Sequence, residues 1–177
     1  AEYTRYIIEH LPHNIDVTTF SNLVASEELI RRDEENVIRC WSAYFDDLDQ
    51  LYQKITIEHL DAVHFQFNFG LFELNALISL IKKLKINKIR TIITFHSVAD
   101  TEAFGKKISL GDFKEDLKLV DAIWVHTSDD REKLLSIGLD ENVIQIPQGN
   151  KVYPDIDMNL IRSNVFSNSK IISTFGF

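Results

Sequence analysis

The fold is decided by residues 89–95, which read IRTIITF and form an almost continuous apolar run. Such a run is typical of a strand in a parallel sheet whose two faces are both covered by helices. Around it, short β-branched runs alternate with longer segments that carry apolar residues at helical spacing. The pattern therefore predicts an α/β domain with a Rossmann-like, doubly wound and mostly parallel sheet.

The alternation is most regular after residue 61. There we expect strands at 62–67, 91–95, 122–126 and 143–146, and helices at 74–84, 113–119 and 129–137. Earlier in the chain we expect a helix at 1–11, strands at 15–20 and 37–41, and a helix that opens with Asp46, Asp47 and Asp49. Thr127 or Ser128 can cap the helix at 129–137, and Gly138 can close it.

Composition changes near residue 150 and suggests domain boundaries. We expect a Rossmann-like domain over 1–150, a linker with a short helix over 151–169, and the start of a missing domain over 170–177, where a strand-like run ends in glycine. The sequence opens in what looks like the middle of an amphipathic helix without a capping residue. The first strand of the sheet is therefore expected to be missing.

Charge and cysteine content exclude several classes of protein. A net charge of -8 argues against a surface that neutralises nucleic-acid phosphates. The only cysteine, Cys40, allows neither an intrachain disulfide nor a zinc cluster built on thiolates, and it fits a reducing cytoplasm. No window approaches the ~20 consecutive apolar residues of a membrane span.

Common catalytic motifs do not occur in the sequence. It contains no phosphate-binding P-loop, no dinucleotide fingerprint, no nucleophile elbow and no zinc-protease pair. Residues 47–49 read DLD, a form that coordinates metal-bound nucleotides in some transferases, but here they open a predicted helix. We expect no metal there.

Polar residues follow the predicted strands at the edge where ligands bind in open parallel sheets. His96 follows a largely apolar strand, so its imidazole should emerge at this edge, where it can contact a sugar hydroxyl or a phosphate oxygen. A structural role for His96, a buried structural His64 and simple helix capping by Thr127 remain alternatives. The other candidate binding residues are Gln66, Asn68, Gly70, Ser97, His126, Thr127 and Gly149.

Four segments together resemble the N-terminal, acceptor-side domain of family 4 glycosyltransferases, retaining enzymes of the GT-B fold. They are residues 61–70 (DAVHFQFNFG), 94–97 (TFHS), 120–128 (VDAIWVHTS) and 143–150 (VIQIPQGN). Their order and spacing carry the resemblance, which spans essentially the whole chain. It implies that His96 is catalytic and reaches the donor sugar or its phosphate, and that Gly149 allows close approach. Gln148 departs from the family, which often has histidine at this position.

The resemblance also implies a reaction and its partners. A sugar would pass with retention from a nucleotide-sugar donor, held by the missing C-terminal domain, to a carbohydrate or glycolipid acceptor bound here. The donor is a co-substrate, and no cofactor or metal is expected. We expect a cytoplasmic protein, with peripheral contact at the inner face of a membrane left open, and no turnover by this fragment alone. The alternative is a non-catalytic α/β module that binds a small ligand or a partner.

Overall fold

The computed structural model describes residues 2–25, 37–43, 46–103 and 106–149. Helices and strands alternate along the chain, with one short antiparallel strand pair, β5 and β6, that the sequence pattern did not predict. In chain order the elements are α1 (Glu2–Glu9), β1 (Thr19–Asn22), β2 (Val37–Trp41), α3 (Asp49–Ile57), β3 (Ala62–Phe67), α4 (Leu74–Ile86), β4 (Arg90–Phe95), β5 (Thr101–Ala103), β6 (Lys106–Ile108), η1 (Leu110–Phe113), α5 (Lys114–Leu117), β7 (Ala122–Val125), α6 (Ser128–Ser136) and β8 (Val143–Gln145).

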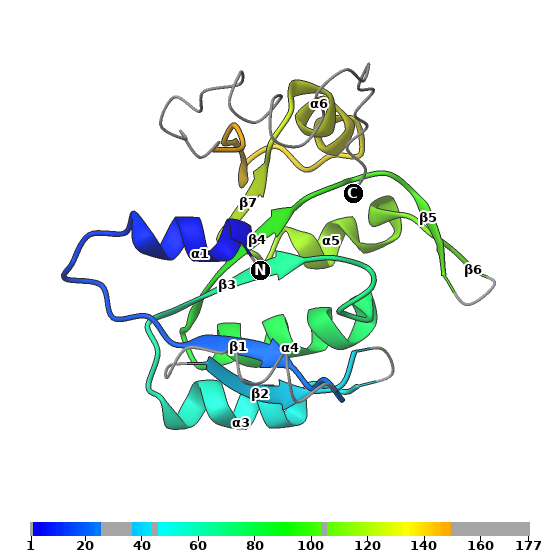
Figure 1. Ribbon diagram of the computed structural model, residues 1–177. Coiled ribbons are helices and arrows are strands. Elements are labelled where there is room, and N and C mark those ends of the chain that lie inside the picture. Colours follow the sequence, from blue (N-terminus) through cyan, green and yellow to red (C-terminus); the bar gives the residue numbers. More distant parts are fainter. Residues whose placement is uncertain (1, 26–36, 44–45, 104–105, 150–177) are drawn as a thin grey trace, which may run out of the picture. The chain divides into compact units, whose positions relative to one another are not determined.

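The central feature is a four-stranded parallel sheet in the order β3-β4-β7-β8. The arrows of β3, β4 and β7 point the same way in Figure 1, and α4 runs alongside β3 and β4. The sequence pattern therefore predicted correctly an α/β fold with a parallel sheet flanked by helices, an arrangement consistent with a Rossmann-like domain.

The first two strands form a separate parallel pair, β1 with β2. In the described part of the chain, β1 and β3 are not hydrogen-bonded to each other. Four consecutive residues of each, 19–22 and 63–66, line a groove of about 730 Å³ together with α1 and β2. Because side chains alternate between the faces of a strand, consecutive lining residues show that strand edges face the groove.

The core is built from β4, β7 and the inner face of α4. Ile93 and Ile123 on neighbouring strands are fully buried. Leu77, Ile81 and Leu84 on α4 are also fully buried and recur at helical spacing, so one face of the helix covers the sheet. Each such side chain contributes roughly 1.5–3 kcal/mol by leaving water.

Several element boundaries differ from those expected. The strand expected at 15–20 runs from Thr19 to Asn22. The helix expected at 113–119 is instead a 3-10 turn followed by a single helical turn that ends at Leu117. Its earlier start has a local cause, because the Ser109 side chain accepts a hydrogen bond from the Gly111 amide and caps the turn. Gly138 follows α6 with a φ of 88°, as expected of a residue that closes a helix.

Contacts divide the chain into two compact units, Ala1–Pro147 and Gln148–Phe177. All helices and strands above belong to the first unit. The linker expected at 151–169 and the strand expected at 170–177 lie outside the described residues. Among the described residues, the helices are too short or too polar to cross a bilayer.

We expect Ile93→Ala to lower the free energy of unfolding by about 2–5 kcal/mol, because the deletion leaves a cavity in the middle of the sheet. Urea unfolding followed by circular dichroism measures the loss. Ile86→Ala is the matched control, since Ile86 is 81% exposed and its truncation should change the free energy by no more than about 0.5 kcal/mol. Equal losses in both variants would contradict this assignment of the core.

Candidate functional site

The candidate site lies where β3, β4 and β7 end side by side. The register pairs Phe67 with Phe95 and Phe95 with Val125, the last residues of the three strands. The residues that follow these strands must therefore emerge at the same edge of the sheet. His96 follows β4 and His126 follows β7. Their ring centroids are 5.3 Å apart. The sheet thus brings together two residues that are 30 positions apart in the sequence.

His96 is exposed and is held by its neighbours on one side. Its Nε2 donates a hydrogen bond to Oε1 of Gln66 at 2.9 Å. The Tyr3 ring contacts it edge-on, with centroids 5.2 Å apart. Partial burial of the ring, and secondly the nearby His126, lowers the pKa of His96 below its ordinary value. His96 is therefore largely neutral near pH 7.

His126 is anchored by its other ring nitrogen. Nδ1 donates to the backbone oxygen of Ile146 at 2.9 Å, so Nε2 of the neutral ring is an acceptor. Nε2 is buried and has no hydrogen-bond partner among the described residues. The Tyr3 ring lies edge-on to this imidazole too, at 5.2 Å between centroids. An unsatisfied buried acceptor is unfavourable, so this nitrogen would gain from a bound donor group.

A second polar layer lies beneath His96, within the sheet. Nε2 of the half-buried His64 is 2.7 Å from Oγ1 of the buried Thr94 and 3.2 Å from Nε2 of Gln66. The Trp124 ring packs against the His64 ring in a T-shaped arrangement, with 4.6 Å between centroids. Burial, and secondly the nearby His96, lowers the pKa of His64 to about 4. His64 is thus a neutral link between the sheet interior and the edge.

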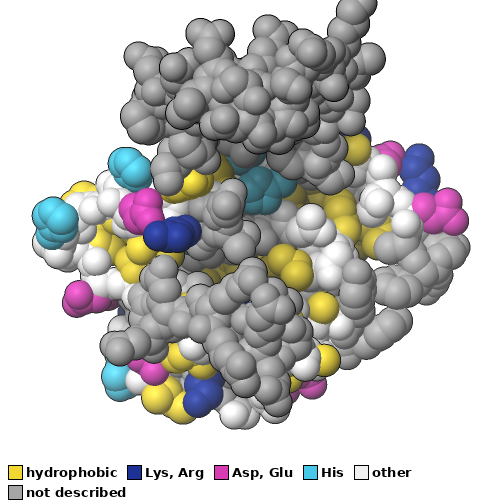
Figure 2. Space-filling view, viewed as in Figure 1, with side chains coloured by type: hydrophobic (Ala, Val, Ile, Leu, Met, Phe, Trp, Pro, Cys, Tyr) yellow, Lys and Arg dark blue, Asp and Glu magenta, His cyan; other side chains and the backbone are white. Residues whose placement is uncertain are grey.

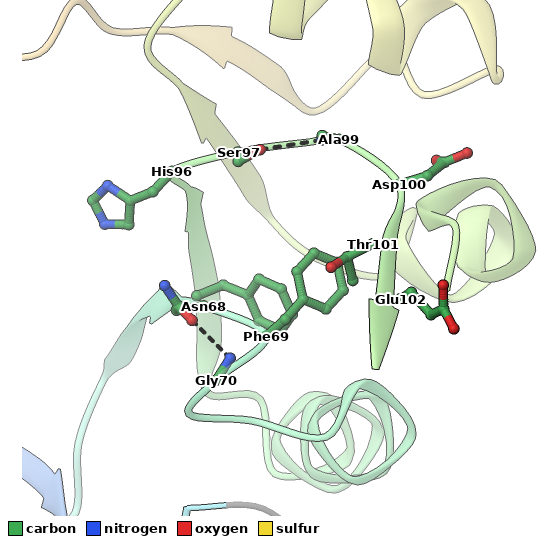
Figure 3. A pocket seen from close by; sticks show the side chains of 10 residues that line it. Asn68, Phe69, Gly70, His96, Ser97, Ala99, Asp100, Thr101 and Glu102 are labelled. Carbon is green, nitrogen blue, oxygen red and sulfur yellow. Dashed lines mark hydrogen bonds between the residues drawn. The ribbon is translucent and has the colours of Figure 1, made fainter. Parts of the chain in front are cut away.

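An open cavity of about 450 Å³ lies beside His96 and is lined by residues 67–70, 96, 97 and 99–102. Figure 3 shows the His96 ring turned away from Asp100 and Glu102. Asn68 and Ser97 line the cavity and have local hydrogen bonds. Oδ1 of Asn68 accepts from the Gly70 amide at 2.7 Å, and Oγ of Ser97 accepts from the Ala99 amide at 3.2 Å. The Asn68 amide nitrogen and the Ser97 hydroxyl hydrogen remain as donors.

Asp100, at the acidic end of this cavity, is paired with two lysines. Nζ atoms of Lys107 and Lys133 lie 3.3 and 3.4 Å from the Asp100 carboxylate. A hydrogen bond from Ser109, and then those from the two lysines, lowers the pKa of Asp100. A carboxylate with these partners is a poor proton acceptor, so general-base chemistry does not follow from its presence here.

Two further candidates have other roles or other surroundings. Thr127 is the N-cap of α6, where its hydroxyl accepts from the Asp130 amide at 3.1 Å and lies 2.7 Å from the Asp130 carboxylate. The capping alternative is therefore confirmed for Thr127. Gly149 belongs to the second compact unit, and a Cβ built on it meets no atom within 4 Å. Close approach of a ligand at Gly149 stays a prediction.

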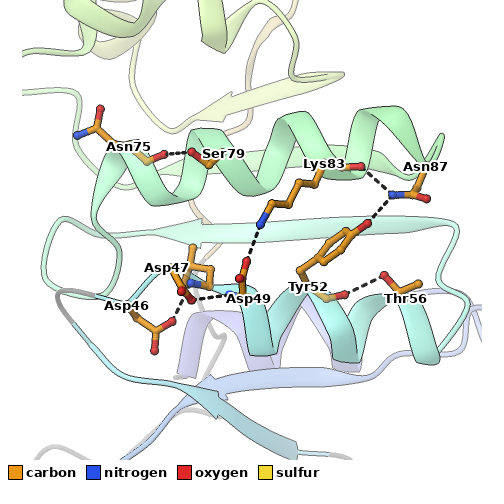
Figure 4. A network of polar contacts seen from close by, with 10 residues as sticks. Asp46, Asp47, Asp49, Tyr52, Thr56, Asn75, Ser79, Lys83 and Asn87 are labelled. Atoms are coloured by element: carbon orange, nitrogen blue, oxygen red, sulfur yellow. Dashed lines mark hydrogen bonds and ion pairs between the residues drawn. The ribbon is translucent and has the colours of Figure 1, made fainter.

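The DLD segment supports packing between helices. Asp49 opens α3 and pairs with Lys83 of α4, whose ammonium also lies 5.5 Å from the centre of the Tyr52 ring (Figure 4). Asp47 accepts a hydrogen bond from the Asp49 amide at 2.9 Å. Across the residues that the structure describes, no group of three acidic, histidine or cysteine side chains is placed to hold a metal.

Sequence reasoning missed two members of the site, Tyr3 and Thr94. Tyr3 was assigned to the apolar face of the first helix, and nothing in the sequence places that helix over the strand ends. Thr94 lies in an apolar run, and the sequence shows only which face of its own strand it occupies. The pairing of β3 with β4, which places Thr94 opposite Gln66, is seen only in the structure. In the view of Figure 2, histidine and apolar side chains are exposed near one another.

Comparisons with known proteins add no assignment. A scan against protein-family models, a search of curated proteins and a search of solved structures each gave no match to this chain.

Because His64 is protonated at about pH 4 in the folded chain but near 6.5 when unfolded, the unfolded state binds more protons between these values. Stability should therefore fall as the pH drops through this window, by at most about 1.4 kcal/mol per pH unit from this group. We expect His64→Gln to make the slope of unfolding free energy against pH shallower between pH 4 and 6.5. The exposed His13→Gln is the control, and identical slopes for wild type and His64→Gln would contradict the assignment.

Proposed function

We propose that this chain is the acceptor-side half of a retaining, GT-B-type glycosyltransferase. The observation that carries the proposal is the pairing of His96 and His126 at the carboxyl edge of a parallel sheet, with Gln66 hydrogen-bonded to His96. Ligands of open α/β sheets bind at this edge. The resemblance of the four sequence segments to family 4 glycosyltransferases supports the choice of chemistry, as an analogy rather than a demonstrated relationship.

The character of the edge favours a neutral, hydroxyl-rich ligand. Around His96 its polar groups are imidazoles, amides and a serine hydroxyl, and the carboxylates of Asp100 and Glu102 line the other end of the cavity; all of these groups can form hydrogen bonds with sugar hydroxyls. Tyr3 adds an aromatic wall next to both histidines. The cavity of about 450 Å³ lies within the range of small-molecule sites. These properties support sugar binding more than binding of a polyanion.

In the proposed reaction, the bond between the anomeric carbon and the leaving phosphate oxygen breaks on the donor. A bond forms between that carbon and an acceptor hydroxyl oxygen, and the hydroxyl proton leaves with the nucleotide diphosphate. His96 holds a sugar hydroxyl in the reacting geometry, which lowers the entropic part of the barrier. The charge on the diphosphate needs cationic or amide donors, and in this proposal the other half of the enzyme supplies them.

The test is nucleotide release by the complete gene product from a panel of UDP, GDP and ADP sugars, with a cell extract as the source of acceptors. We expect one nucleotide to be released and His96→Ala to lower the rate roughly 10- to 1,000-fold, because a positioned hydrogen bond at the reacting sugar is lost. The exposed His13→Ala is the matched control and should retain the wild-type rate.

Two outcomes would count against the proposal. If no donor releases its nucleotide, the chain is better described as a non-catalytic α/β binding module. If release occurs but His96→Ala matches the wild type, the sugar is held elsewhere on the molecule. Circular dichroism of each variant confirms that the fold is retained.

A further inference from the structure

We propose that Gln66 is a positioning residue that couples the protonation of His64 to that of His96. Through this coupling Gln66 determines which ring nitrogen of His96 is unprotonated. A continuous line of polar side chains runs from Thr94 through His64 and Gln66 to His96. Its three contacts measure 2.7, 3.2 and 2.9 Å. Gln66 is the only member that touches both histidines through one rigid group.

The inner half of the line defines the tautomer of His64. The Gln66 amide nitrogen can only donate, so Nε2 of His64 must accept and carries no proton. The Thr94 hydroxyl lies closer to the same nitrogen, so the two donors share its single lone pair. Since burial lowers the pKa of His64 to about 4, the neutral ring carries its proton on Nδ1. This is the less favoured tautomer of free histidine, so the surroundings must select it.

The outer half follows from the same amide. With its nitrogen directed at His64, Gln66 presents its oxygen to His96, and an amide oxygen can only accept. Nε2 of His96 therefore carries the proton, and Nδ1 of the neutral ring is unprotonated. Turning the amide over would reverse both histidines together. One planar group thus ties a buried imidazole to an exposed one.

The geometry of the sheet makes this coupling possible. Gln66 pairs with Thr94 in the register of β3 and β4, and His64 lies two residues before Gln66 on the same face of β3. His96 follows β4 directly. The four side chains therefore lie on the same face of two hydrogen-bonded strands, and backbone pairing fixes their spacing.

The consequence for ligand recognition rests on the proposed function. A His96 held in this form offers Nδ1 as an acceptor, which suits a hydroxyl that donates its hydrogen. The described residues form no hydrogen bond to Nδ1 of His96. The coupling itself can be measured on this chain without substrate or turnover, so its failure is distinguishable from failure of the glycosyltransferase proposal.

The test is nitrogen-15 NMR of the imidazole rings at pH 7, which reports the tautomer of each histidine. In the wild-type chain we expect His64 with its proton on Nδ1 and His96 with its proton on Nε2. His64 with its proton on Nε2, or His96 with its proton on Nδ1, would overturn the proposal. This reading needs no variant and so does not depend on whether a variant folds.

Variants then test the coupling through Gln66. In Gln66→Glu the carboxylate can only accept, so His64 should switch its proton to Nε2 and the pKa of both histidines should rise. In Gln66→Leu, His96 should become a mixture of tautomers. The exposed Gln145→Leu is the matched control and should leave both rings unchanged. If the rings of Gln66→Glu and Gln66→Leu, with native-like amide spectra, keep their wild-type tautomers, the coupling does not exist.

Discussion

In-register parallel pairing of β3, β4 and β7 is the constraint on which the rest of the structure depends. Because each strand ends level with the next, at Phe67, Phe95 and Val125, the residues that follow emerge at one edge. A one-residue slip in any pair would move every side chain of that strand to the other face. A slip between β3 and β4 would break the contacts of His64 with Thr94 and of Gln66 with His96, although the composition of the chain would be unchanged.

The same pairing explains how polar groups are tolerated inside the sheet. Thr91 and Thr94 are fully buried on β4, yet each side chain has a polar partner. Oγ1 of Thr91 bonds to Asp121, which also accepts from the Thr91 amide and pairs with Lys85. Thr94 bonds to His64. The partners come from elements adjacent to β4, so the burial of these hydroxyls is compensated where the strands meet.

How much could be predicted from the sequence depended on the range of the interactions involved. The strand at 62–67 follows from a local pattern, and the structure has it at the expected residues. The helix cap was expected at Thr127 or Ser128, and the structure has it at Thr127. The continuous apolar run at 89–95 predicted a strand covered on both faces. The structure has this strand as β4, most of whose residues are buried. The 3-10 turn at Leu110 and the pair β5 and β6 were missed, because short elements with few apolar residues leave no periodic signal.

The candidate site shows a similar division between local and distant contacts. Adjacency of His96 and His126 could be expected from strand ends, but the contact of Tyr3 with both could not, since it depends on where α1 docks. The role of Gln66 was also beyond the sequence. Gln66 was expected to bind a ligand, whereas both ends of its amide contact histidines. Which polar groups are already engaged is a property of side-chain geometry.

The clustering of His64, His96 and His126 also limits which ligand charge the edge can favour. Burial, and secondly a neighbouring imidazole, lowers the pKa of both His64 and His96. His64 and His96 therefore carry little positive charge at neutral pH, although histidine often binds anions. A neutral imidazole can still bind a ligand by hydrogen bonding. Such binding distinguishes ligands by the placement of their donors and acceptors. For such a site, the tautomer of each ring determines recognition as directly as its position does.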